Sequence, residues 1–128
     1  MLPENVKFTR RNEWCRQEED RIVVFGLTDH AVEHLSDIIY VELPDVGDDV
    51  LNDVSCGEVE SLDNVVEVFS PADGEVLEVN TRAIDTPEII PKDPYKDGWL
   101  LKIRVNDPSQ LQDLLTPQQY ADKIKRRG

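Results

Sequence analysis

Positive charge is missing from the middle of this 128-residue sequence. Residues 22–81 contain no lysine or arginine, although they contain fifteen aspartates and glutamates. The whole chain has 14 basic and 27 acidic residues, which gives a formal net charge of −13. Nucleic acids and anionic membranes bind proteins through clustered basic side chains, so we expect neither as a partner.

Cysteines and long apolar runs are also scarce. The two cysteines, Cys15 and Cys56, have no metal-binding spacing, and we expect reduced thiols rather than a disulfide. No apolar run approaches the roughly 20 residues of a membrane span. The first residues lack the basic and apolar regions of a secretion signal. Together these absences predict a cytoplasmic protein.

The sequence does contain many short segments rich in β-branched and aromatic residues. Turn residues separate them, including two Pro-x-x-Gly turns, Pro44–Gly47 and Pro71–Gly74, whose glycines permit a positive φ. Short strands at this spacing predict one all-β domain, a barrel or sandwich, over residues 1–128. The expected strands are 21–25, 37–43, 58–61, 65–69, 74–79 and 99–105.

Helical signals are confined to a few places. Thr28 is placed to cap a short helix that ends near Leu35, and Asn80 to cap a turn over 81–84. Prolines at 108 and 117 are typical of helix starts. Residues 108–128 are therefore expected to form a C-terminal helical segment of the same domain.

Several separate blocks of sequence stand in the order and spacing of one known family. They include Asn12-Glu13-Trp14, Asp37–Pro44, Gly57–Ser61, Ser70-Pro71 and Gly98-Trp99. In these blocks the chain resembles the H protein of the glycine cleavage system. The resemblance implies the flattened β-barrel sandwich of lipoyl and biotinyl carrier domains, with small helices packed outside.

The resemblance also implies a carrier rather than an enzyme. In that family a lysine at a hairpin tip is amide-linked to lipoate, and the lipoyl arm carries an aminomethyl group between enzymes. The implied partners are glycine decarboxylase, aminomethyltransferase, dihydrolipoyl dehydrogenase and lipoate-handling proteins. Free family members are largely monomeric, so we expect a monomer here.

The residue at the lysine position is the main departure from the family. Where the family reads Glu-Ser-Val-Lys, this chain reads Glu60-Ser61-Leu62-Asp63, and matching blocks on both sides fix the register. No lysine occurs between Lys7 and Lys92, and a carboxylate cannot form an amide with lipoate. We therefore predict that the lipoyl position at Asp63 is vacant and that no lipoate is bound. Asp63-Asn64 still favours a tight turn, tolerant of the left-handed conformation, so the hairpin should survive.

Two hypotheses from different classes follow. In the first, the chain is a non-carrier scaffold or regulator in glycine cleavage. In the second, it is a protein-binding module that works in another lipoate-linked pathway. Lipoate on Lys92 or Lys96 is less favoured, because neither lies in a hairpin. Catalysis is not expected, since no Ser/His/Asp, Cys/His or paired-carboxylate motif is evident.

Two positions in the Asn12-Glu13-Trp14 block bear on a cofactor site. The family has histidine where this chain has Asn12. The glutamate of the family block helps to hold the loaded arm in a cleft. Glu13 is thus either a remnant of that cleft or a surface carboxylate. Trp14 is expected in the core, as is Trp99 within a strand.

His30 and His34 have the i, i+4 spacing that some metal sites use. Asp29 and Glu33 lie nearby, but no cysteine or third histidine does. The corresponding family helix often carries histidines without a metal, so we predict no metal site.

Overall fold

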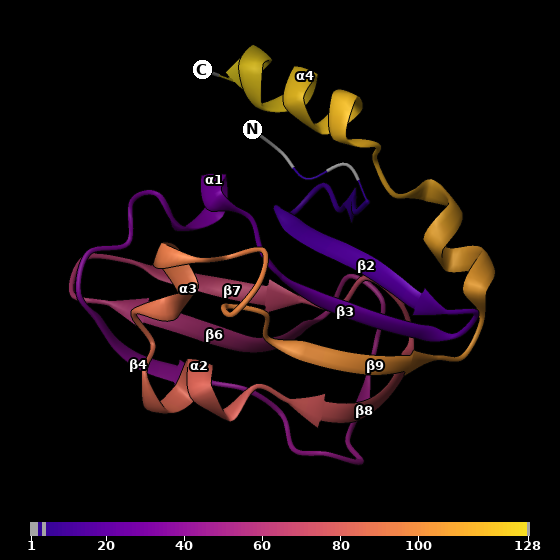
Figure 1. Cartoon of the computed structure of the whole chain (residues 1–128), viewed down its shortest axis with the longest axis horizontal. Coiled ribbons are helices and arrows are strands. Elements are labelled where there is room, and N and C mark those ends of the chain that lie inside the picture. Colours follow the sequence, from indigo (N-terminus) through magenta and orange to yellow (C-terminus); the bar gives the residue numbers. More distant parts are fainter. Residues whose placement is uncertain (1–2, 4, 128) are drawn as a thin grey trace.

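Two antiparallel β-sheets packed face to face form the body of the protein. The computed structural model describes residue 3 and residues 5–127, without the side chains of 126 and 127 (Figure 1). The six-stranded sheet has the order β1 (Lys7–Phe8), β2 (Glu13–Glu19), β3 (Ile22–Leu27), β9 (Leu101–Val105), β8 (Gly74–Val79), β5 (Asp49–Val50). The three-stranded sheet has the order β4 (Ile38–Glu42), β6 (Ser55–Ser61), β7 (Val65–Phe69). The predicted β-sandwich is confirmed.

Short helices connect and flank the sheets. They are α1 (Asp29–Val32), α2 (Thr81–Asp85), α3 (Ile89–Lys92), the 3₁₀-helix η1 (Pro108–Asp113) and α4 (Pro117–Arg127). Figure 1 shows α4 lying outside the sheets, on the side where β2 lies. None of the described helices is long and apolar enough to cross a membrane.

The two predicted helix caps have different outcomes. The Thr28 hydroxyl accepts the Ala31 N–H at 3.1 Å, which confirms this cap, although α1 ends at Val32 rather than near Leu35. The Asn80 side chain does not cap α2. Its amide donates instead to the carbonyls of Asp97 and Trp99, because the loop before β9 places these acceptors within 2.8 and 2.6 Å.

The main core lies between the sheets. It joins Val23 and Phe25 of β3 to Val59 of β6 and Val68 of β7, all of them buried. Burying such a side chain contributes roughly 1.5–3 kcal/mol. This core fixes the three-stranded sheet, and with it the hairpin of interest, against the larger sheet.

A second core lies beneath α4. The Phe8 and Tyr120 rings stack there with centroids 4.5 Å apart, and Trp14 is wholly buried, as predicted. The Trp14 Nε1 donates to the Pro94 carbonyl at 2.8 Å. Trp99 packs against the same core but is only partly buried and precedes β9, so its placement within a strand is wrong.

Candidate functional site

The hairpin of β6 and β7 is intact and closely hydrogen-bonded at its tip. The Ser61 N–H donates to the Asn64 carbonyl at 2.8 Å. The Ser61 hydroxyl, which is buried, accepts the N–H groups of Asn64 and Asp63 at 3.1 and 3.4 Å. The Leu62 N–H donates to the Asp37 carbonyl at 3.2 Å, which fastens the tip to the start of β4. The predicted turn is therefore present.

Asp63 lies at the exposed tip of this hairpin. Its Oδ2 accepts a hydrogen bond from the Ser36 hydroxyl at 3.3 Å. Neither Asp63 nor Asn64 is among the described residues with positive φ, so the turn depends on Ser61 rather than on a left-handed residue. A carboxylate at the tip can accept hydrogen bonds but offers no amine for acylation. The tip thus lacks the nucleophile that an amide bond to lipoate requires.

Glu13 occupies the opposite end of the hairpin, inside the protein. It extends from β2, and its side chain is wholly buried, so the surface-carboxylate interpretation is wrong. One oxygen accepts the Thr9 hydroxyl at 2.5 Å, and the other accepts the Phe69 N–H at 3.2 Å. Phe69 is six residues from Asp63, roughly 20 Å along an extended strand.

Burial changes the acidity of Glu13. Loss of hydration raises the pKa of this carboxyl from 4.5 to about 7, while the hydrogen bonds from Thr9 and Phe69 lower it. The positive charge of Arg11 also lowers the pKa, and Asp53 raises it. The group can therefore hold or release a proton near neutral pH, which a surface glutamate does not do.

Arg11 and Asp53 form an ion pair next to Glu13. The Arg11 Nε and the Asp53 Oδ1 are 2.5 Å apart, and the guanidinium lies 4.3 Å from the centroid of the Phe69 ring. A surface pocket of about 540 Å³ is lined by Glu13, this ion pair and Ser70, among others. The buried Glu13 carboxyl therefore lies behind the wall of a pocket that is open to the surface.

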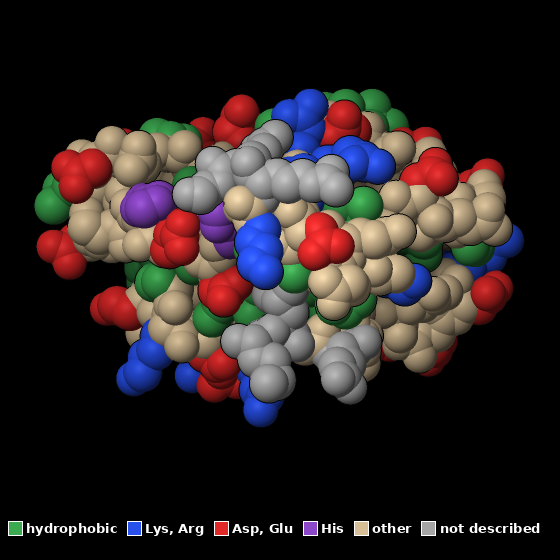
Figure 2. All heavy atoms as spheres, turned by 90° about the horizontal axis from the view of Figure 1, so that it is seen from above, with side chains coloured by type: hydrophobic (Ala, Val, Ile, Leu, Met, Phe, Trp, Pro, Cys, Tyr) green, Lys and Arg blue, Asp and Glu red, His purple; other side chains and the backbone are tan. Residues whose placement is uncertain are grey.

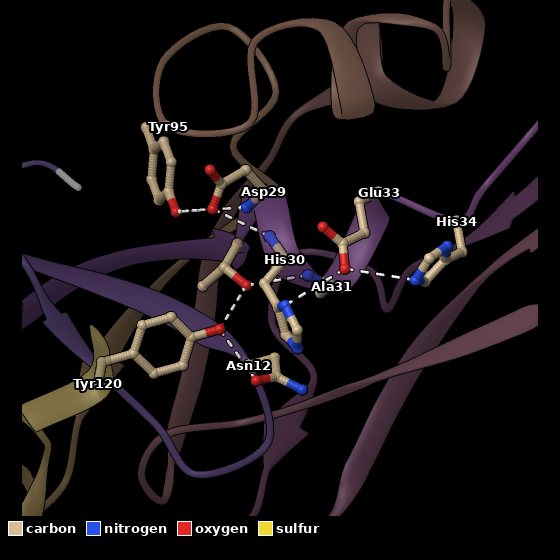
Figure 3. A network of polar contacts seen from close by, with 9 residues as sticks. Asn12, Asp29, His30, Ala31, Glu33, His34, Tyr95 and Tyr120 are labelled. Atoms are coloured by element: carbon tan, nitrogen blue, oxygen red, sulfur yellow. Dashed lines mark hydrogen bonds and ion pairs between the residues drawn. The ribbon is translucent and has the colours of Figure 1, made fainter. Parts of the chain in front are cut away.

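The residue before Glu13 has a structural role. Asn12 adopts a φ of 72°, a left-handed conformation that asparagine tolerates better than most residues. Its Oδ1 accepts the Tyr120 hydroxyl at 2.9 Å, and the Tyr120 oxygen lies 2.8 Å from the Thr28 hydroxyl (Figure 3). This chain of bonds ties α4 and α1 to the turn that positions Glu13.

The two histidines share one carboxylate. The His30 Nδ1 and the His34 Nε2 lie 3.4 and 3.3 Å from the same Glu33 oxygen, and Figure 3 shows both contacts meeting there. His34 lies beyond the end of α1, so the histidines do not form a helical i, i+4 pair. Within the described ranges, no group of three or more His, Cys, Asp or Glu side chains is arranged to hold a metal ion.

Sequence reasoning missed the surroundings of Glu13. Thr9 and Arg11 belong to the same turn as Glu13, but Asp53 and Phe69 come from two distant parts of the chain, and only the packing of the sheets brings these two to Glu13. The lysines considered as alternative attachment sites lie elsewhere: Lys92 ends α3 and Lys96 follows it in a turn.

Comparison with known proteins gives one consistent result. The model of the family described as glycine cleavage H-protein matches residues 6–127. A glycine cleavage system H protein from Anaeromyxobacter sp. (strain K) is 46% identical over 119 residues, which cover 93% of this chain and 92% of that protein. One from Alkalilimnicola ehrlichii is 39% identical over 123 residues, which cover 96% and 95%.

A solved structure agrees with these sequence matches. The crystal structure of a glycine cleavage system H protein from Mycobacterium marinum superposes with a TM-score of 0.87 at 38% identity, covering 97% of this chain and 99% of that one. The fold, the coverage of both chains and the sequence identities all indicate the same family. The chain therefore belongs to the glycine cleavage H-protein family.

Proposed function

We propose that this chain is a glycine cleavage H-protein homologue that carries no lipoate and acts as a scaffold or regulator by docking to proteins of that system. The observation that carries the proposal is the side chain at the hairpin tip. Asp63 stands where the family's lysine would, on a turn whose backbone remains well bonded. The hairpin on which the family carries its lysine is present, and its tip residue offers no amine for acylation.

The pocket at Glu13 gives further support. In the family the corresponding glutamate helps to hold the loaded arm, and here the carboxyl is buried and fixed by two hydrogen bonds. The Arg11–Asp53 ion pair borders the same pocket. A protein without a lipoyl arm has no carried group to bind in this pocket. The pocket is then a remnant, in which the lining side chains bond to one another.

The proposal is tested first by attempted lipoylation. The purified protein is incubated with a lipoate ligase, lipoate and ATP, and its intact mass is measured. We expect no mass increase, whereas a lysine-bearing H protein in the same reaction should gain one lipoyl group. A lipoyl adduct on the unmodified sequence would overturn the proposal.

The converse substitution tests the state of the hairpin. Asp63→Lys should become a lipoyl acceptor, because the turn already presents this position to solvent. Leu62→Lys is the matched control, since Leu62 is also exposed but lies one residue away from the family position. Lipoylation of both variants would mean that the ligase does not recognise the tip geometry.

Binding experiments separate this role from a module in another pathway. The tagged protein is mixed with purified glycine decarboxylase, aminomethyltransferase and dihydrolipoyl dehydrogenase, one at a time. Retention of at least one of them supports the proposal. If none is retained while a lysine-bearing H protein binds under the same conditions, the module in another pathway is favoured.

A further inference from the structure

The outer face of the three-stranded sheet carries an unusual cross-strand pattern. Register pairs Tyr40 with Glu60 and Glu60 with Val65, so these three side chains share one face. Two residues further along, Glu42 pairs with Glu58 and Glu58 with Glu67. The intervening row, Val41, Val59 and Val66, points to the opposite side, and Val41 and Val59 are buried.

Three glutamates side by side do not stabilise a sheet. Like charges directly opposite each other on neighbouring strands are unfavourable. Residues 38–69 contain no lysine or arginine that could offset them. The pKa of Tyr40 is raised, most strongly by the charge of Glu42, then by loss of hydration and the hydrogen bond to Glu42, and further by the charges of Glu58 and Glu60.

Other surfaces of the molecule are different. Figure 2 shows the face on the side of α4, where Lys and Arg side chains lie interspersed among Asp and Glu side chains. Charges of both signs also meet across the larger sheet, where Lys102 lies 3.3 Å from Glu18 and 3.5 Å from Glu78. Taken as whole sheets, the described strands of the three-stranded sheet carry four glutamates and no basic residue, whereas those of the six-stranded sheet also carry lysines and arginines.

The same face exposes large apolar side chains. The pairing of β4 with β6 is irregular between Ile38 and Tyr40, which leaves both Ile39 and Tyr40 about half exposed, at 56% and 50%. Val65 and Leu62, at the end of the hairpin, are 54% and 66% exposed. Exposed apolar side chains gathered together and bordered by polar residues are typical of a protein-interaction surface.

We propose that this face, formed by Ile39, Tyr40, Glu58, Glu60, Val65 and Glu67, docks a protein segment that carries lysines or arginines together with an apolar anchor. The inference rests on the proposed function, for which it names the surface and the chemistry of the partner. Charge complementarity selects the occupant: only a cationic segment relieves the row of glutamates, and an apolar anchor covers Tyr40 and Val65.

The dimensions of the face suit a helix. Rows on one face of a strand are about 7 Å apart, and side chains at i and i+4 of a helix are about 6 Å apart. Two arginines at this spacing can therefore each meet a different row of acids. A leucine one turn before the first of these arginines, on the same face of the helix, would lie over the apolar end of the sheet face.

The experiment uses the full chain and a short synthetic helical peptide with arginines at i and i+4 and leucines at i−4 and i−3. Peptide binding is followed by backbone amide NMR. We expect chemical-shift changes to centre on β4, β6 and β7. Changes spread over all exposed acids, or centred on another face, would overturn the inference.

Matched variants measure how much the glutamates of this face contribute to peptide binding. The double variant Glu58→Gln/Glu67→Gln should weaken peptide binding about 2- to 30-fold at low salt, the factor that two exposed ion pairs give. The control Glu19→Gln/Asp20→Asn removes two exposed acids, one at the end of β2 and one in the turn after it, and should leave binding unchanged. Equal weakening by both variants would show nonspecific attraction to net charge.

The apolar part is tested at high salt. Val65→Thr keeps the β-branched shape and should weaken the binding that persists when charges are screened. If Val65→Thr had no effect, this would contradict an apolar anchor.

Self-association of the free chain through this face, detected as concentration-dependent size, would identify a second copy as the occupant and overturn the proposal. Peptide binding without retention of any glycine cleavage enzyme would leave this surface intact and count only against the proposed function.

Discussion

The Glu13 carboxyl connects the two sheets. It extends from β2 of the six-stranded sheet and accepts the Phe69 N–H, at the end of β7 in the three-stranded sheet, at 3.2 Å. Because the acceptor is ionisable and buried, this connection depends on pH. A neutral carboxyl keeps an acceptor for Phe69 without the cost of a buried charge.

The first prediction concerns stability against pH. The pKa of Glu13 is raised from 4.5 in the unfolded chain to about 7 in the folded one. Its contribution to stability is therefore fully present below pH 4.5, and it is lost as the pH rises through 7, because the unfolded chain ionises first. The loss is on the order of 3 kcal/mol.

Glu13→Gln isolates this effect from all other titrations. Glutamine retains an acceptor and cannot ionise, so the variant should match the original chain at low pH. Above pH 7 it should be more stable by up to the same 3 kcal/mol or so. Urea unfolding of both proteins across the pH range gives the difference directly. A difference that does not change with pH would show that Glu13 titrates alike in both states.

The second prediction concerns the ion pair beside Glu13. Since the charge of Arg11 lowers the pKa of Glu13 and that of Asp53 raises it, Arg11→Gln should raise this pKa and Asp53→Asn should lower it. NMR titration of the labelled Glu13 side-chain carboxyl measures both shifts. Arg82→Gln, an exposed arginine on α2, is the control and should cause no shift. Shifts of the same sign in the Arg11 and Asp53 variants would contradict the electrostatic explanation.

Much of the sandwich could be predicted because the residues within most of its strands favour β-structure by themselves. The segments at 65–69 and 74–79 were predicted with the bounds of β7 and β8. By contrast β2, with the sequence Glu-Trp-Cys-Arg-Gln-Glu-Glu, was missed: its last residues are exposed and polar, and pairing with β3 holds it in the sheet. The helix α3 was missed because proline lies within its four residues.

Two glycines also show what the sequence alone can and cannot predict. Gly47 has a φ of 94°, as a Pro-x-x-Gly turn predicts. Gly74 is not among the positive-φ glycines of the described residues. It is required for another reason: a Cβ there would lie 2.3 Å from the Arg104 carbonyl oxygen on the neighbouring strand. Likewise the tip residue Asp63 could be placed from sequence, but the burial of Glu13 depends on contacts between distant segments.

The third prediction concerns Asn12. Asn12→Gly keeps the left-handed backbone accessible and removes the bond to Tyr120, whereas Asn12→Ala removes the same bond and places there a residue that disfavours this conformation. We expect the alanine variant to be the less stable of the two by about 1–2 kcal/mol. Chemical denaturation measures the difference. Tyr120→Phe removes the same hydrogen bond, together with the contact to the Thr28 hydroxyl, without changing the turn. If the glycine and alanine variants lose equal stability, the left-handed backbone conformation is not the reason why asparagine is favoured at position 12.

The fourth prediction concerns the cost of the cross-strand glutamates to the fold. Glu58 lies between Glu42 and Glu67, so Glu58→Gln removes two repulsive pairs at once and Glu67→Gln removes one. We expect both variants to be more stable than the original chain, Glu58→Gln by about 0.4–2 kcal/mol and Glu67→Gln by roughly half of that. The gain in stability should shrink in high salt, because screening already weakens the repulsion in the original chain.

Urea unfolding at low and high salt measures both effects, with Asp20→Asn as the single-charge control. A gain that does not change with salt would point to packing rather than charge. A loss of stability would mean that these carboxylates stabilise the free sheet, and their arrangement would then need no partner to explain it.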